Sequence, residues 1–406
     1  MAKPADRTTA LWVLRRLRDA GFEALFAGGS VRDMLLKRRC SDYDIATDAQ
    51  PLEVKRLFRH VLLVGAKFGV AMVIHRGRKV EVTTFRSDVS YSDGRRPDAV
   101  RFSNPQEDAR RRDFTINGMF YDPIGEKVID FVGGRADLRR RVVRTIGPPE
   151  ERFAEDYLRM IRAVRFAVAL DFRIDASTAD AIAERAANIA SISGERIFDE
   201  LGKMLARESA PAAVRKLHEL GLAREILPEL LADETKWDEA LGRLDAAAAK
   251  KDLNLSLGAL LAGLTGGQIR RVLRRWGGSN DLATELCFHS KHLGDWRHAA
   301  GMPLCEFKRL MACEWFDRLR VLWKAEERRI DDAETQSRRI ARRAKAIPAD
   351  QIAPEPYVTG DELIAMGLRE GPCLGRLLRQ LYDAQLNGEI TSREQARALA
   401  RRFIEA

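Results

Sequence analysis

The chain contains Phe26-Ala27-Gly28-Gly29-Ser30-Val31-Arg32-Asp33, followed closely by Cys40-Ser41-Asp42-Tyr43-Asp44-Ile45. The first stretch reads as the end of a strand, a glycine turn and the first turn of a helix, where free backbone N–H groups favour an anion. In the second stretch Asp42 and Asp44 alternate along an extended backbone, so both carboxylates point the same way. Together the two stretches predict a divalent metal ion beside a phosphate, and Mg²⁺ is the expected ion.

Each stretch alone has an ordinary interpretation, because Gly-Gly often precedes a helix and Asp-Tyr-Asp is compatible with a solvated turn. The combination resembles the nucleotidyltransferase signature of the polymerase-beta superfamily, in the branch that holds the class II CCA-adding enzymes and the bacterial poly(A) polymerases. This resemblance implies that Asp42 and Asp44 are catalytic and bind the metal. It also implies that Gly28, Gly29 and Arg32 contact the nucleotide.

Length and composition predict several domains and allow a nucleic-acid partner. The 406 residues exceed a single core, and 45% apolar residues are enough to bury several. The 70 Lys and Arg against 60 Asp and Glu give a net charge of +10, which fits a polyanionic partner without identifying one. No apolar run approaches the roughly 20 residues of a membrane span, and the N-terminus lacks the apolar core of a signal peptide. We therefore expect a cytoplasmic protein.

The cysteines and histidines give no clear metal site. The five cysteines are widely spaced and never form Cys-x-x-Cys, so they predict neither a disulfide framework nor a zinc ribbon. His289, His292 and His298 cluster near Cys287 and Asp295. Their spacing matches no familiar ligand pattern, which favours ordinary core or surface residues while leaving a metal site open.

The texture of the chain changes after Gly147-Pro148-Pro149. The part before it mixes helices with short apolar or β-branched runs typical of strands. The predicted strands are Phe22–Ala27, Asp42–Ala46, Ala71–His75, Lys79–Phe85 and Lys127–Phe131, and the predicted helices are Thr8–Ala20, Val31–Leu36 and Pro51–Arg59. The part after it is rich in alanine, leucine and arginine at helical spacing. The fold class is therefore α+β and multi-domain, with a mixed-sheet head before an all-helical remainder.

The resemblance gives these parts roles. It implies a polymerase-beta-like nucleotidyltransferase head over residues 1–146 and a helical neck over 147–206 that selects the base. A helical body over 207–290 and a helical tail over 291–406 that binds tRNA follow.

Two further segments of the head carry candidate chemistry. Two divalent ions hold the attacking and leaving oxygens of nucleotidyl transfer in line, and Glu81 is a candidate third catalytic carboxylate, with a solvent-facing position as the alternative. Residues 107–119 contain an arginine cluster suited to a triphosphate, although a solvated charged face is also compatible. This segment resembles the family motif Arg-Arg-Asp-Phe-Thr-Ile-Asn-Ala, with Gly118 where alanine is usual. The resemblance implies that Arg112 contacts the nucleotide and Asp113 its sugar.

In the segment Glu151–Phe166, charges every third residue are typical of one face of a helix, and the plain alternative is an amphipathic helix without further function. An aspartate acceptor beside an arginine donor complements the pairing edges of cytosine and adenine. Uracil and guanine are mismatched there, which can reject them by on the order of 10⁴. The segment is similar to the Glu-Asp-x-x-Arg motif with which class II CCA-adding enzymes select CTP and ATP without a nucleic-acid template. The resemblance implies that Asp156 and Arg159 pair with the base, with Arg162 and Arg165 near base and phosphate.

Three local features distinguish members of the family. The segment Val64–Val70 looks like the CCA-type version, and Gly69 favours tRNA over poly(A) synthesis. The loop Ser87–Pro97 is full length, whereas it is shortened in enzymes that add only CC, so we expect adenine addition. The tail from Val358 to Gly375 is similar to the tails of bacterial CCA-adding enzymes.

The resemblance therefore implies a Mg²⁺-dependent CCA tRNA nucleotidyltransferase. It would transfer CMP, CMP and AMP from CTP and ATP to the tRNA 3′ end and release pyrophosphate. A poly(A) polymerase or an enzyme that adds only A is the alternative with the same chemistry. A non-catalytic RNA-binding protein is the alternative from another class, and the paired carboxylates count against it because binding alone does not need them. The sequence indicates no protein partner and no membrane.

Overall fold

The computed structural model describes residues 3–4, 6–40, 42–64, 66–88, 100–330 and 334–405. The chain divides into two compact units. The first comprises residues 1–204, 209–231 and 275–277, and the second comprises residues 205–208, 232–274 and 278–406. Most of the loop expected to permit adenine addition lies outside the described residues, as does Gly65. The predicted domain boundaries at 146, 206 and 290 remain predictions.

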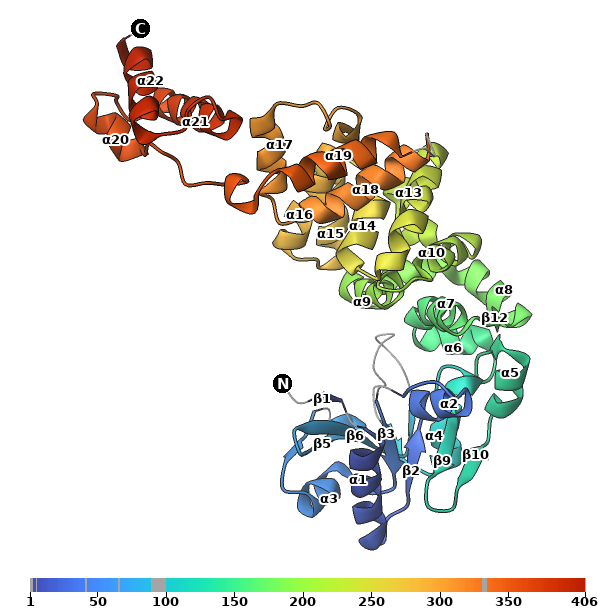
Figure 1. Ribbon diagram of the computed structural model, residues 1–406. Helices are drawn as coiled ribbons and strands as arrows, with labels where there is room; N and C mark the ends of the chain where they lie inside the picture. The colour runs from blue at the N-terminus through green and yellow to red at the C-terminus, as the bar shows by residue number, and fades with distance from the viewer. Residues whose placement is uncertain are drawn as a thin grey trace. The chain divides into compact units, whose positions relative to one another are not determined.

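The first unit contains a mixed sheet in the order β10-β9-β2-β3-β6-β5-β4, with β1 beside β6 (Figure 1). Its strands are β1 Lys3–Pro4, β2 Ala24–Ala27, β3 Asp44–Thr47, β4 Val61–Leu62, β5 Val70–His75, β6 Arg78–Thr84, β9 Met119–Asp122 and β10 Lys127–Asp130. Two small pairs accompany it, β7 Arg86–Asp88 with β8 Val100–Phe102 and β11 Val142–Val143 with β12 Arg173–Ile174. All five predicted strands are present with slightly shifted ends, and the predicted α+β class is confirmed.

The strand register positions two acidic residues. Strand β2 pairs antiparallel with β3, and Ala27 lies opposite Asp44. Strand β3 pairs parallel with β6, and Ile45 lies opposite Val82. Continued by one residue, this register places Asp44 beside Glu81. Residues 24–27 are all buried, as expected for a central strand covered on both faces.

Among the helices of the first unit, α1 and α3 pack against the sheet (Figure 1). The helices are α1 Arg7–Asp19, α2 Gly29–Leu35, α3 Pro51–Leu57, α4 Pro105–Arg110, α5 Gly134–Arg140, α6 Pro149–Glu155, α7 Leu158–Leu170, α8 Ala176–Arg185, α9 Gly194–Leu205, α10 Ala210–Glu219, α11 Leu222–Ile226 and α12 Pro228–Leu231. The short 3₁₀ helices η1 Ala66–Phe68, η2 Thr115–Asn117 and η3 Ala186–Ser191 connect them. The three predicted helices of the head are confirmed.

The helical face predicted for the charges at 156, 159, 162 and 165 does not include Asp156. Helix α6 ends before Asp156, whose backbone is extended (φ −161°, ψ 103°), and α7 begins at Leu158. The Asp156 carboxylate accepts a hydrogen bond from the Leu158 amide at 3.1 Å. Aspartate favours this local turn, in which its side chain binds the backbone N–H two residues on, so the residue that fits the charge periodicity also separates the two helices.

The second unit consists of helices, and two apolar clusters are described within it. The helices are α13 Glu234–Ala247, α14 Leu253–Leu261, α15 Gly266–Trp276, α16 Asn280–His292, α17 Leu304–Met311, α18 Phe316–Arg328, α19 Thr335–Ala346, α20 Gly360–Ala365, α21 Pro372–Asn387 and α22 Arg393–Glu405, with 3₁₀ helices η4 Ala248–Lys250, η5 Leu293–Arg297 and η6 Ala349–Gln351. The last residues of α15 belong to the first unit. One cluster includes Phe307 and Trp323, and the other, near the C-terminus, includes Leu363 and Leu381.

The histidine segment of α16 is structural in this arrangement. His289 is fully buried, and His292 Nδ1 lies 2.7 Å from Asp295. Among the described residues, no three histidine, cysteine or acidic side chains are grouped so as to hold a metal ion. All five cysteines are free. Across the described part of the chain, no helix is both long enough and apolar enough to traverse a membrane.

Candidate active site

Three carboxylates influence one another electrostatically where β3 and β6 lie side by side. Asp42 is exposed just before β3, whereas Asp44 is its first residue and Glu81 lies on β6. Burial and the charges of Glu81 and Asp42 raise the pKa of Asp44 to about 7. Burial and the charge of Asp42 also raise the pKa of Glu81. A divalent cation relieves this kind of repulsion, and Mg²⁺ typically takes only one or two protein carboxylates together with substrate phosphates.

The glycine turn after β2 depends on its first glycine. Gly28 has a φ of +69°, and a Cβ atom there would lie 3.1 Å from Nη1 of Arg112. Any other residue would be strained and would crowd that guanidinium. The Gly28 amide donates to the Met119 carbonyl at 3.3 Å, so it is not one of the free N–H groups predicted at this turn.

Two arginines are fixed by a buried carboxylate that the sequence did not single out. Asp108 is fully buried and lies 2.6 Å from Arg111 Nη2 and 2.9 Å from Arg112 Nη2. Burial alone would raise the pKa of Asp108, but the charges of Arg112 and Arg111 lower it. The carboxylate therefore stays ionised and holds both guanidinium groups. The only sequence signal was its place in the charged run 107–113.

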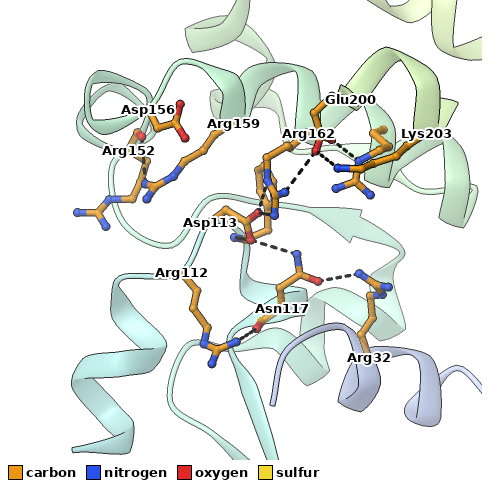
Figure 2. Close-up of polar contacts among 12 residues, drawn as sticks. Arg32, Arg112, Asp113, Asn117, Arg152, Asp156, Arg159, Arg162, Glu200 and Lys203 are labelled. Atoms are coloured by element: carbon orange, nitrogen blue, oxygen red, sulfur yellow. Dashed lines mark hydrogen bonds and ion pairs between the residues drawn. The ribbon is translucent and has the colours of Figure 1, made fainter. Parts of the chain in front are cut away.

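Asp113 connects the head to α7 (Figure 2). Its carboxylate accepts hydrogen bonds from Arg162 Nη2 at 2.6 Å and from Asn117 Nδ2 at 3.1 Å. Asn117 in turn accepts from Arg32 at 2.8 Å. Burial alone would raise the pKa of Asp113, but the charge of Arg162 and these hydrogen bonds lower it to about 2. Asp113 therefore fixes Arg162, and its predicted contact with the nucleotide sugar remains a prediction.

The predicted base-pairing residues have separate partners. Asp156 lies 2.7 Å from Arg196 Nη2 on α9. Arg159 Nη1 lies 2.5 Å from Glu155 and donates to the Arg152 carbonyl at 3.1 Å. Each side chain is therefore oriented by a neighbour rather than by the other. This contact could not be predicted from the sequence, because Arg196 lies 40 residues beyond Asp156.

Glu200, one turn after Arg196 on α9, forms ion pairs with Arg162 and Arg165 of α7. This carboxylate is 2% exposed and lies 2.5 Å from Arg165 Nε and 3.6 Å from Arg162 Nη1. Burial opposes its ionisation, but Arg165 and its other cationic neighbours lower its pKa. Arg165 also lies over the Phe166 ring, 4.0 Å from its centroid. Sequence reasoning missed Glu200 because nothing local connects it to α7.

These groups surround a cavity of about 470 Å³, the active-site cavity. Nine of the twelve predicted site residues line it, namely Gly28, Gly29, Arg32, Asp44, Arg112, Asp113, Asp156, Arg159 and Arg162. The other lining residues are Arg111, Asn117, Leu158, Phe166 and Arg196. Asp42, Glu81 and Arg165 lie outside the lining set. Six arginines against three aspartates make the cavity suited to a triphosphate.

Comparison with known proteins identifies the family. Residues 24–144 match the poly A polymerase head domain, and residues 171–234 match the probable RNA- and SrmB-binding site of polymerase A. Over 398 residues the chain is 36% identical to a CCA-adding enzyme of Limosilactobacillus reuteri, covering 96% of this chain and 94% of the relative. The chain belongs to the class II CCA-adding enzyme and poly(A) polymerase family. This confirms the resemblance, makes the protein a nucleotidyltransferase and implies dependence on a divalent metal ion.

Two further family members match over nearly their whole length. A CCA-adding enzyme of Lactobacillus gasseri is 34% identical over 405 residues, which cover 97% of this chain and 96% of that protein. The crystal structure of the Bacillus stearothermophilus CCA-adding enzyme in complex with CTP superposes with a TM-score of 0.81 at 32% identity and covers 98% of both chains. The head and the helical remainder therefore share one architecture with this relative.

Proposed function

We propose that this enzyme adds CMP, CMP and AMP from CTP and ATP to the 3′ end of tRNA, without a nucleic-acid template, and releases pyrophosphate. The observation that carries the proposal is a single cavity lined by Asp44, by a group of arginines and by Asp156. Full-length relatives named CCA-adding enzymes support it. We also propose that the enzyme acts in the cytoplasm, and we keep 1–146, 147–206, 207–290 and 291–406 as its head, neck, body and tail.

The carboxylate cluster fits a divalent cation, and we assign Mg²⁺ held by Asp42 and Asp44. The raised pKa of Asp44 supports this, because the folded protein pays for an uncompensated negative charge there. When bound, the ion neutralises triphosphate charge and orients the reacting oxygens. Arg112 and Arg32 are placed to hold the phosphates from the cavity wall. Glu81 adds negative charge beside Asp44.

Base selection follows from donors and acceptors that are oriented in advance. In the contacts described, Asp156 uses one oxygen for the Leu158 amide and the other for Arg196. Each carboxylate oxygen has a second acceptor site, so Asp156 still accepts from an exocyclic amino group. Arg159 has five N–H donors, and its described contacts use only those on the Nη1 nitrogen. Cytosine and adenine offer the matching pattern, whereas uracil and guanine leave buried polar groups unpaired.

The backbone at Gly69 favours CCA addition over poly(A) synthesis. Its φ is +78°, and a Cβ atom there would lie 3.2 Å from Phe102 and 3.3 Å from Thr84. The poly(A)-type version of this segment resembles Gly-Arg-Arg-Phe-Arg, with arginine in place of Gly69, and this conformation does not accommodate arginine without strain. The position therefore supports a tRNA substrate.

The direct test is incorporation into defined tRNAs. The purified protein is incubated with labelled CTP or ATP and tRNA that ends before CCA, at CC or at CCA, and the products are sized. Addition of three nucleotides that then stops supports the proposal. A long A ladder indicates poly(A) synthesis, and ATP use only on the CC end indicates A addition. EDTA should abolish incorporation and Mg²⁺ restore it, while Asp42→Ala should abolish incorporation with tRNA binding nearly intact.

A further inference from the structure

A second cavity, of about 550 Å³, lies within the first unit. We call it the arginine cavity, because Arg110, Arg144 and Arg152 line it and none of the described residues in its lining is acidic. Arg110 belongs to the same run as Arg111 and Arg112, which line the active-site cavity. Consecutive residues of the chain therefore line the two cavities.

The three arginines of this cavity differ in how strongly they are engaged. Arg144 lies 3.2 Å from both Asp137 and Asp175, and it connects these two carboxylates. Arg152 lies 2.5 Å from Glu155 through Nη2 and donates from Nη1 to the Arg110 carbonyl at 3.4 Å, which leaves one further N–H on each of these nitrogens. Arg110 is exposed, and its guanidinium forms no hydrogen bond or ion pair with the described residues. The free binding capacity therefore lies on Arg110 and Arg152.

An aromatic ring completes the lining. Phe131 is 44% exposed, and exposed rings of this kind stack on the bases of single-stranded nucleic acid. Arginine forks match phosphate oxygens. A free phosphate ion would use the arginines but leave the ring unexplained, whereas a nucleotide of an RNA strand uses both.

We infer that the arginine cavity binds one nucleotide of the RNA substrate, upstream of its reacting 3′ end, with the phosphate on Arg110 and Arg152 and the base on Phe131. This inference rests on the proposed function. Arg152 shares Glu155 with Arg159, and both arginines lie 2.5 Å from that carboxylate. The bound nucleotide is therefore one carboxylate away from the arginine that is proposed to select the incoming base.

Equilibrium binding of tRNA that lacks CCA, measured without nucleotides, tests the inference independently of catalysis. Arg110→Ala and Phe131→Ala should each raise the Kd for this tRNA by roughly five- to tenfold. Both side chains are exposed, so folding should be unaffected. Only Arg110→Ala should reduce the steepness of the salt dependence, because only it removes a phosphate contact. The matched control is Arg139→Ala, an exposed arginine of α5 outside both linings, and its Kd should stay within about twofold.

Shortened RNAs locate the nucleotide. The 3′ strand of the acceptor stem is trimmed one nucleotide at a time, and the effects of both variants should vanish at the same length. Unchanged Kd values in both variants, or effects that vanish at different lengths, would overturn the inference. Weaker inhibition by pyrophosphate in Arg110→Ala with normal tRNA binding would also overturn it, in favour of a free-phosphate site. The proposed function fails separately, when the wild-type protein does not add three nucleotides.

Discussion

Replacing Asp44 by asparagine is expected to stabilise the metal-free protein while abolishing incorporation. Burial and the charges of Glu81 and Asp42 raise the pKa of Asp44 from 3.8 to about 7. At 1.36 kcal/mol per unit of pKa, keeping this carboxylate ionised in the folded state costs ~4 kcal/mol. Asparagine has nearly the same shape and no charge, so Asp44→Asn removes this cost together with a proposed metal ligand.

The stability advantage of Asp44→Asn should increase with pH. Between pH 3.8 and about 7 the folded protein binds one more proton at Asp44 than the unfolded chain does. Wild-type stability therefore falls as the pH rises through this window. Above the window, the stability that the protonated Asp44 carboxyl contributes is fully lost. The advantage of Asp44→Asn should be ~3 kcal/mol larger at pH 8 than at pH 5. Mg²⁺ should stabilise the wild type at pH 8 much more than the variant, because the ion compensates the charge.

Urea unfolding with EDTA at pH 5 and pH 8 measures both quantities, and a labelled-CTP assay confirms the loss of activity. The control is Asp19→Asn, the same change at the exposed end of α1, whose effect should not vary between these pH values. The stability advantage of Asp44→Asn could be equal at both pH values, or the variant could be less stable at pH 8. Either result would refute the reasoning that burial and neighbouring carboxylates raise the pKa of Asp44.

Three other substitutions test the surrounding contacts. Arg196→Ala should lower the preference for CTP over UTP by about tenfold or more, because Asp156 loses the partner that orients it; an unchanged ratio of kcat/KM values contradicts this. Glu200→Gln should raise the KM for CTP about tenfold, since two α7 arginines lose their shared carboxylate; a pure loss of stability with an unchanged KM would indicate a structural role only. Gly118→Ala should destabilise the fold by about 1–2 kcal/mol, because its Cβ would lie 2.7 Å from a methyl carbon of Val132, and adding Val132→Ala should restore most of the loss in thermal unfolding.

Local pattern predicted much of the head. Runs such as Ala71–His75 and Lys79–Phe85 appear as β5 and β6 because apolar and β-branched residues recur there with few interruptions. Strand β9 Met119–Asp122 was missed, since it follows the charged motif directly and only four residues form it. The order of strands is a long-range property, so the sequence showed paired aspartates but not that Glu81 lies on the strand beside Asp44.

Nine of the fourteen residues that line the active-site cavity were predicted, but the contacts between them were not. Asp113, Arg162 and Arg159 were identified by motif, and they line one cavity. The ion pair between Asp113 and Arg162 spans 49 residues of chain, and no local periodicity encodes it. Gly118 departs from the usual alanine of its motif, and the structure supplies the reason, because Val132 and Ile146 occupy the space a methyl group would need.

A protein that replaces a nucleic-acid template must orient its donors and acceptors before the base arrives, since flexible side chains would lose the discrimination in ordering them. The structure meets this requirement with shared carboxylates. Asp113 fixes Arg162, Glu155 fixes Arg159, and Glu200 fixes Arg165. Each arginine keeps further N–H groups beyond those used by its carboxylate. Under the proposed function, orientation and binding capacity are thus supplied by the same side chains, which would account for the number of arginines around a site that replaces a base pair.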